Sequence, residues 1–236
     1  RMPEQRNRIL IDHMSDILLP YNQYHRENLI KENIHPSKIF CTGNTTFEVM
    51  REFSSQIDNS DILNRLKLKS KEYILITAHR SENVDNSEYL HKIIEATGRI
   101  AKHFDCEVIY PMHPRTKSKL SSFKIPKGVR IMDPLGFYDF NHLLKESFCV
   151  VSDSGTAAEE GLFYKVPNVS LRMATERPET VESGATIISG MNIENIVESV
   201  ETAVSLTWSA KYDFAEDHSP SSVVINAIRS QITNFF

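Results

Sequence analysis

The chain has 236 residues with a formal net charge of −4, and 40% of its residues are hydrophobic and 25% charged. These values suit a globular protein of one large or two small domains. The acidic balance argues against nucleic acid or an anionic membrane as a partner, so a polyanionic ligand must be held by a local site. No apolar run is as long as a membrane span, and the start, RMPEQRNR, lacks a signal-peptide core, so the cytoplasm is the expected compartment.

Apolar strand-like runs alternate with helical patterns along almost the whole chain. In chain order, the predicted strands are 15–20, 38–43, 73–78, 106–112, 129–133, 148–152 and 167–171. The predicted helices are 22–33, stretches of 45–67, 87–104, the segment after 155, 192–207 and 220–232. Because continuous apolar strands alternating with helices indicate a parallel sheet covered on both faces, the predicted fold class is α/β with a Rossmann-like sheet.

The cysteines and histidines form no metal-binding pattern. Cys41, Cys106 and Cys149 are far apart in the sequence and form neither a CxxC motif nor a disulfide framework, so buried thiols are expected. The nine histidines include no HxH or HExxH motif. We therefore expect neither a metal site nor a cofactor.

Ligands of a doubly wound sheet bind beyond the carboxyl ends of its strands, which here directs attention to four loops. These are Thr42–Asn44, Thr77–Glu82, Met112–Thr116 and Asp153–Thr156. The second carries His79 and the third carries His113. A lone histidine after a strand is more often structural than catalytic, but two such loops in one sheet favour a site.

The strongest local signal is VVSDSGTAAEEG, residues 150–161. A strand runs into Ser154, Gly155 and Thr156 and then into a helix, whose free N–H groups and hydroxyl neighbours favour an anion such as phosphate. The alternative is an ordinary helix cap, since Asp, Ser and Thr are the usual capping residues. Glu160, one turn later, would repel phosphate and is better suited to accept hydrogen bonds from a ribose diol; its alternative is a solvated helix face.

The segment RMATERPETVESG, residues 172–184, places Arg172 and Arg177 just after a predicted strand. Arginine suits bidentate phosphate recognition, and Pro178 stiffens the loop. The alternative is a surface ion-pair cluster of Arg177 with Glu176 and Glu179, which would contribute little.

Together these segments resemble a known family. PEQRNRILIDHMSDI, CTGNT, TAHRSENV, DSGTAAEEG and RMATERPETVESG occur in the order and at the spacing found in the non-hydrolysing UDP-N-acetylglucosamine 2-epimerases. The resemblance implies two Rossmann-like domains of the GT-B type. Residues 1–43 would then complete a first domain whose beginning is missing, 44–215 would form the UDP-binding second domain, and 216–236 would form a helix packing back toward the first.

The resemblance also implies a reaction, in which UDP-GlcNAc and UDP-ManNAc interconvert by elimination of UDP to a 2-acetamidoglucal and re-addition. Since C2 has no adjacent carbonyl, departure of UDP must drive loss of its proton, and the site must stabilise the leaving diphosphate. The implied context is cell-surface polysaccharide precursor synthesis. A UDP-sugar substrate and a homodimer are the partners it implies.

The family's site residues match positions of this chain. His79 matches the histidine beside the leaving diphosphate, and Glu4 matches an acidic member of the catalytic set. The matched UDP-binding positions are Leu135 and Phe140 for uracil, Ser154, Gly155 and Thr156 for phosphate, Glu160 for ribose and Arg177 for the diphosphate. Arg80 and His113 match positions at which some bacterial members bind a second, activating UDP-sugar.

Three alternatives stay open at this stage: a GT-B glycosyltransferase, a non-catalytic UDP-sugar-binding fragment, and a hydrolysing variant that releases ManNAc and UDP. Thr156 stands where a second Gly is commoner, and Ala158 where many members have Gln. These two departures resemble branches that act on other UDP-2-acetamido sugars, so the sugar itself stays undefined.

Overall fold

The computed structural model describes residues 3–208 and 219–232, with the side chains of all of these except 3–5, 115, 121 and 122. By its internal contacts the chain divides into two compact units. One combines Arg1–Phe53 with Asp213–Phe236, and the other is Ser54–Tyr212.

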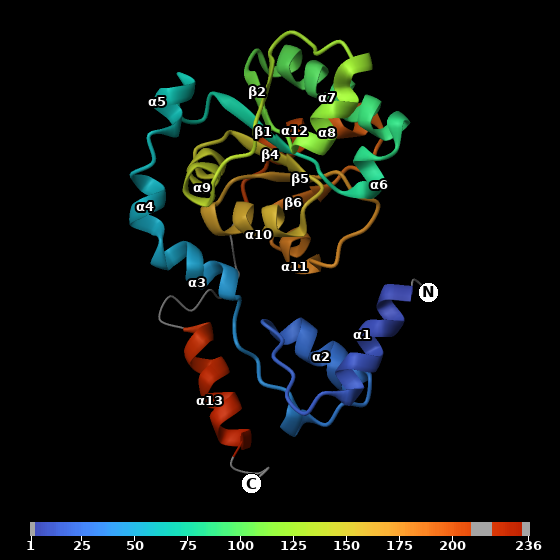
Figure 1. Cartoon of the computed structure of the whole chain (residues 1–236), viewed down its shortest axis with the longest axis vertical. Coiled ribbons are helices and arrows are strands. Elements are labelled where there is room, and N and C mark those ends of the chain that lie inside the picture. Colours follow the sequence, from blue (N-terminus) through green and yellow to red (C-terminus); the bar gives the residue numbers. More distant parts are fainter. Residues whose placement is uncertain (1–2, 209–218, 233–236) are drawn as a thin grey trace. The chain divides into compact units, whose positions relative to one another are not determined.

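The unit Ser54–Tyr212 is built around a six-stranded parallel sheet in the order β3-β2-β1-β4-β5-β6 (Figure 1). Its strands are β1 (Tyr73–Thr77), β2 (Glu107–Pro111), β3 (Val129–Met132), β4 (Cys149–Ser152), β5 (Asn168–Ser170) and β6 (Thr186–Ile188). Its helices are α4 (Ser54–Asp58), α5 (Ile62–Leu66), α6 (Ser81–Val84), α7 (Ser87–Phe104), α8 (Pro114–Lys117), η2 (Ser118–Ser122), α9 (Phe137–Lys145), α10 (Gly155–Tyr164), α11 (Pro178–Glu182) and α12 (Ile193–Ser205). The predicted α/β fold with a Rossmann-like parallel sheet is therefore confirmed.

The strands build two cores because successive side chains point to opposite faces of the sheet. On β1, Ile74 and Ile76 belong to a core that includes α7 and α12, whereas Tyr73 and Leu75 belong to a core that includes α9 and α10. Both faces of the sheet are thus covered by helices. This is why β1 is apolar from Tyr73 to Ile76 rather than alternating.

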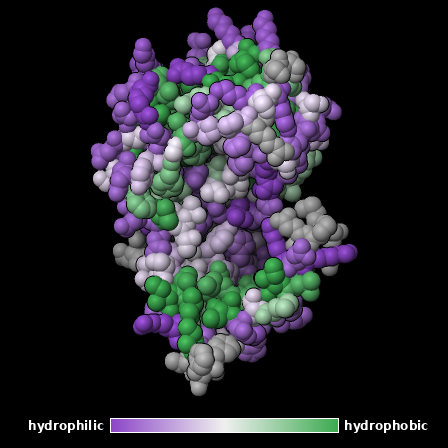
Figure 2. Space-filling model, viewed as in Figure 1, coloured by the Kyte–Doolittle hydropathy of each residue, from purple (hydrophilic) through white to green (hydrophobic). Residues whose placement is uncertain are grey.

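The regular elements described in the other unit are helices. This unit contains α1 (Pro3–Met14), α2 (Gln23–Lys31), η1 (Pro36–Lys38), α3 (Thr45–Glu52) and α13 (Pro220–Ile232). Glu48 on α3 accepts hydrogen bonds from Ser219 and Ser221 at the start of α13. Figure 2 shows hydrophobic side chains gathered over α13, where Ile225, Ile228 and Ile232 are exposed.

Several local predictions were wrong. Segments 15–20 and 38–43 are not strands: they run side by side but form only an isolated parallel bridge between Leu18 and Ile39. Their backbone bonds end where Pro20 accepts the N–H of Thr42, because proline has no N–H to extend the ladder. Strand β6 was not predicted, since three residues between glycine-containing turns give too short a pattern.

The sequence also raised two general questions, whether a helix could span a membrane and whether the cysteines are buried thiols. None of the described helices is both long and apolar enough to cross a membrane. All three cysteines are free; Cys149 is buried, while Cys41 and Cys106 are partly exposed, so the expectation of buried thiols holds fully only for Cys149. Burial raises the pKa of the Cys149 thiol to about 12, which makes it unreactive.

Candidate functional site

Three of the four loops singled out in the sequence lie next to one another at the carboxyl edge of the sheet. Strands β1 and β4 are neighbours, with Thr77 paired to Ser152, and β2 lies on the other side of β1. The strand order reverses between β1 and β4, which is where open parallel sheets bind ligands. The fourth loop lies in the other unit, where Asn44 caps α3 by accepting the N–H of Thr46.

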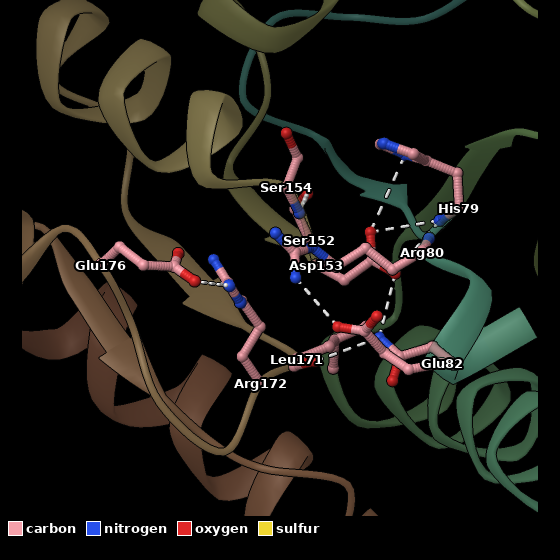
Figure 3. A network of polar contacts seen from close by, with 10 residues as sticks. His79, Arg80, Glu82, Ser152, Asp153, Ser154, Leu171, Arg172 and Glu176 are labelled. Carbon is pink, nitrogen blue, oxygen red and sulfur yellow. Dashed lines mark hydrogen bonds and ion pairs between the residues drawn. The ribbon is translucent and has the colours of Figure 1, made fainter. Parts of the chain in front are cut away.

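Asp153, directly after β4, has a fully buried carboxylate that holds the loop after β1 (Figure 3). It accepts the backbone N–H of His79 at 3.1 Å and of Arg80 at 2.9 Å, and the side-chain amide of Asn83 at 3.0 Å. The Asn83 amide also donates to the Leu171 carbonyl, just beyond β5, at 3.3 Å. One carboxylate thus connects the ends of β1, β4 and β5.

The His79 ring lies at the surface of this network. Its Nδ1 is 3.8 Å from the Asp153 carboxylate, and 56% of the side chain is exposed. At this distance the ring and the carboxylate are neighbours but are not hydrogen-bonded to each other. The exposed ring is therefore accessible to a ligand.

Helix α10 begins at Gly155, beside the Asp153 network. Ser154 is its N-cap residue but makes no side-chain capping bond, and the Ser154 N–H is instead bound by the Ser152 hydroxyl at 2.9 Å. The first N–H groups of a helix have no acceptor within the helix and attract anions. A Cβ at Gly155 would meet only Arg172 Nη1, at an ordinary 3.7 Å, so no protein neighbour requires glycine at this position. The space beside the helix end is open to a ligand.

Two arginines from the loop after β5 lie along α10. Arg172 has a side chain that is only 9% exposed, and it pairs with Glu176 at 2.7 Å (Figure 3). Arg177 donates from Nε to the buried carboxylate of Glu159, also at 2.7 Å. Glu159 lies within α10, so this ion pair holds Arg177 against the helix. The surface cluster with Glu176 and Glu179 that the sequence left as an alternative does not include this buried partner.

Glu160 is buried within α10, and Thr156 is exposed on its first turn. Burial and the neighbouring Glu159 raise the pKa of the Glu160 carboxyl to about 8. Among the residues that the structure describes, none donates a hydrogen bond to this carboxyl. A buried carboxyl without a protein donor suits a ligand that brings hydroxyl groups.

A pocket of about 390 Å³ opens beside the ends of β1 and β2. It is lined by Thr77, Ala78, His79, Val84, Pro111, His113, Thr116, Pro134, Leu135 and Phe140. The lining is mainly apolar with two imidazoles and two hydroxyls, which suits a planar heterocycle. The pocket brings together His79, Leu135 and Phe140.

The two residues matched to a second UDP-sugar are not placed alike. His113 lines the same pocket as His79. Arg80 is not one of the residues that line it, and its guanidinium pairs with Glu82 at 2.9 Å. Glu82 is therefore the ion-pair partner of Arg80 within the loop after β1.

Glu4 lies on α1, in the other unit, and its side chain is outside the described residues. Its place in the catalytic set stays a prediction. Over the described part of the chain, no group of three or more His, Cys, Asp or Glu side chains is arranged to hold a metal ion.

Sequence reasoning missed Asp153, Asn83 and Glu159 as parts of this site. Asp153 had a usable signal: Ser154 follows it and is itself a good N-cap, so an aspartate one residue earlier is left to bond elsewhere. Asn83 and Glu159 had none, since their partners are 70 and 18 residues away in the chain.

Known proteins resemble this chain over nearly its whole length. The family model described as UDP-N-acetylglucosamine 2-epimerase matches residues 1–224. A UDP-N-acetylglucosamine 2-epimerase of Methanocaldococcus jannaschii is 36% identical over 232 residues, covering 94% of this chain and 63% of that protein. A UDP-2,3-diacetamido-2,3-dideoxy-D-glucuronate 2-epimerase of Pseudomonas aeruginosa is 35% identical over 213 residues, covering 88% of this chain and 58% of that protein.

A solved structure gives the same result for the fold. The crystal structure of the Methanocaldococcus jannaschii UDP-GlcNAc 2-epimerase in complex with UDP-GlcNAc and UDP superposes with a TM-score of 0.83 at 34% identity. The match covers 95% of this chain and 65% of that one, so the chain spans less than two thirds of the length of these relatives. The family match and the superposition both extend over nearly all of its residues, and the chain belongs to the UDP-N-acetylglucosamine 2-epimerase family.

Proposed function

We propose that this protein is a UDP-N-acetylglucosamine 2-epimerase that interconverts UDP-GlcNAc and UDP-ManNAc by elimination and re-addition of UDP. The observation that supports this most directly is that three features occur together at the carboxyl edge of the sheet. These are the open N-terminus of α10, the arginine Arg177 held beside that helix, and the base-sized pocket that contains His79. A nucleoside diphosphate needs both an anion cradle for its phosphates and a pocket for its base.

Each side chain has a part in this proposal. Leu135 and Phe140 pack against uracil, Glu160 accepts hydrogen bonds from the ribose, and Ser154, Gly155, Thr156 and Arg177 bind the diphosphate. His79, exposed toward the ligand, stabilises the charge that develops on departing UDP. Glu4 acts as an acidic member of the catalytic set at C2. The proposed context is cell-surface polysaccharide precursor synthesis.

The sugar is proposed at the level of a class, the UDP-linked 2-acetamido sugars. The relative named for a UDP-diacetamido-glucuronate and the one named for UDP-GlcNAc are almost equally similar to this chain, at 35% and 36% identity. Thr156 lies exposed on the first turn of α10, where its hydroxyl can contact a ligand. Parallel assays with both sugar nucleotides test which member of the class is used.

Calorimetric titration with UDP tests the site. Arg177→Ala and Glu160→Ala should each weaken binding by about tenfold or more, because each removes a charged or hydrogen-bonding ligand contact. Arg99→Ala is the matched control: this arginine pairs with Glu95 and Glu194 on the outside of α7, so UDP affinity should stay unchanged. Unchanged affinity in both site variants would rule out the assignment.

The reaction is tested with UDP-GlcNAc in deuterium oxide. An epimerase places deuterium at C2 without any acceptor, whereas a glycosyltransferase releases UDP only when an acceptor is present. Because this chain spans 63% of its Methanocaldococcus jannaschii relative, we expect these 236 residues alone to bind UDP with negligible epimerisation. Robust UDP-ManNAc formation by the purified chain would contradict that expectation, and ManNAc release would indicate the hydrolysing variant.

We further propose a homodimer located in the cytoplasm. The support for both is the family resemblance. Light scattering after size-exclusion chromatography tests the dimer, and cell fractionation tests the compartment.

A further inference from the structure

We propose that Asp153 is a positioning residue that acts through His79: it holds the imidazole where a bound diphosphate meets it. This inference deepens the proposed function and rests on it, since the diphosphate is the ligand of that function. It concerns a residue that belongs neither to the cap of α10 nor to the pocket lining.

The charge of Asp153 is the first reason to look for such a role. A fully buried carboxylate immediately before an anion-binding helix end repels the anion that the helix attracts. The described ion pairs give it no lysine or arginine partner, only the His79 ring at 3.8 Å. A neutral residue at this position would repel a bound anion less than the carboxylate does. The carboxylate must therefore have a role other than direct interaction with the anion.

The hydrogen bonds of Asp153 provide it. Its oxygens accept two consecutive backbone N–H groups, those of His79 and Arg80, which fixes the path of the chain at the point where the His79 side chain leaves it (Figure 3). The Asn83 amide supplies a third bond and is itself tied to the Leu171 carbonyl. The loop after β1 is thereby anchored to both β4 and the segment that carries Arg172.

The contact with the ring completes the arrangement. Asp153 faces Nδ1 of His79, so the opposite ring nitrogen, Nε2, is directed away from the buried carboxylate, and more than half of the side chain is exposed. The other ionisable groups around this ring are His113, which lines the same pocket, and Arg80 and Glu82, which pair with each other on the same loop. The Tyr110 hydroxyl donates to the carbonyl of Ala78, the residue before His79, at 3.1 Å. An anion bound at the end of α10 would therefore contact Nε2 of His79, while Asp153 lies on the Nδ1 side of the ring.

Two accounts of Asp153 make opposite predictions for Asp153→Asn. If the carboxylate were only a nearby negative charge, its removal would tighten UDP binding. If it positions His79, the substitution should weaken UDP binding about tenfold, because an amide presents N–H groups to donors that need an acceptor. Calorimetry with UDP measures this change. Unchanged or tighter binding overturns the proposal.

Binding of uridine distinguishes a loss of His79 positioning from a disruption of the whole site. Uridine occupies the base pocket, which His79 also lines, without reaching the diphosphate cradle, so its affinity, measured by NMR titration, should fall by a smaller factor than that of UDP in Asp153→Asn. An equal loss for uridine and UDP overturns the proposal, because the variant would then have disturbed the whole site. Should Asp153→Asn fail to fold, Asn83→Ala removes one donor of the same network and is expected to show the same selective loss for UDP.

A double-mutant cycle identifies the route of the effect. In a His79→Ala background, Asp153→Asn should no longer weaken UDP binding, since the group that it positions is gone and only the repulsion of the anion is relieved. Losses that simply add overturn the proposal. Glu107→Gln is the matched control: it weakens a two-point ion pair with Arg130 at the start of β2, at the opposite end of the strand, and should leave UDP affinity unchanged.

These outcomes keep the two proposals apart. A wild-type chain that does not bind UDP contradicts the proposed function. A wild-type chain that binds UDP while Asp153→Asn has no selective effect contradicts only the role of Asp153. Amide hydrogen exchange at His79 and Arg80 requires no ligand: it should accelerate in Asp153→Asn and stay slow in Glu107→Gln, and unchanged exchange overturns the positioning role by itself.

Discussion

At the scale of single residues, Glu160 carries the clearest consequence of burial. Its carboxyl has an ordinary pKa of 4.5 in an unfolded chain, and burial together with Glu159 raises it to about 8 in the folded protein. Between these values the folded state binds a proton that the unfolded state has released. The free energy of unfolding should therefore fall as pH rises from 4.5 to 8.

Glu160→Gln should remove this dependence, because glutamine stays neutral. Relative to wild type, the variant should gain on the order of 2–3 kcal/mol in unfolding free energy between pH 5.5 and pH 8. Urea denaturation at several pH values measures the difference. Thr156→Val, on the exposed turn of the same helix, is the control and should show a constant difference from wild type. A constant difference for Glu160→Gln as well would contradict the raised pKa.

At the scale of elements, the placement of α10 depends on its close approach to β5. A Cβ at Gly161 would lie 3.0 Å from the Val166 carbonyl oxygen and 3.4 Å from the Asn168 Cβ. The Val166 backbone cannot yield, since its N–H is bonded to the Gly161 carbonyl at 2.8 Å. Glycine here lets the helix that carries Glu159 and Glu160 lie directly on the sheet.

Gly161→Ala should destabilise the protein by about 1–2 kcal/mol, because overpacking exceeds the helix propensity that alanine adds. Thermal or urea denaturation measures this. Gly136→Ser is the matched control: a Cβ there meets nothing within 4 Å, and Gly136 is the N-cap of α9, without a side-chain cap. Serine should be neutral or slightly stabilising at that position. Equal effects of the two substitutions would contradict the close approach.

At the scale of the whole molecule, the two units differ in the size of their hydrophobic cores. Both large cores and all the described site residues belong to Ser54–Tyr212. The other unit has a small described core of Leu18, Ile34 and Ile39, and its helices expose hydrophobic side chains. Stability and ligand binding should therefore reside mainly in Ser54–Tyr212.

We expect residues 54–212, produced alone, to fold cooperatively and to bind UDP within about threefold of the affinity of the whole chain, since the binding contacts of the proposed site lie inside them. Circular dichroism on heating and calorimetry measure the two properties. A fragment that is unfolded, or folded but unable to bind UDP, would contradict this assignment of the site to one unit.

The sequence by itself determined the class of fold and most of its elements. The strands around Tyr73–Thr77 and Val129–Met132 and the helix Ser87–Phe104 were predicted because periodicity and capping are local properties. It also indicated the strand-end loops, because apolar runs end abruptly there. It failed for β6 and for the segments around Leu18 and Ile39, since whether a short apolar run becomes a strand depends on its partner and not on its own pattern.

Only the tertiary structure decided how the side chains of those loops are used. It paired Arg177 with Glu159, 18 residues away in the chain, and it placed His113 in the pocket of His79, 34 residues away. It also brought the Asp153 carboxylate into hydrogen bonds with backbone N–H groups of a loop more than 70 residues earlier in the chain. The physical reason is common to all three. Ion pairs, pockets and buried carboxylates depend on distances between separate strands, which the sheet order β2-β1-β4-β5 sets and no local pattern contains.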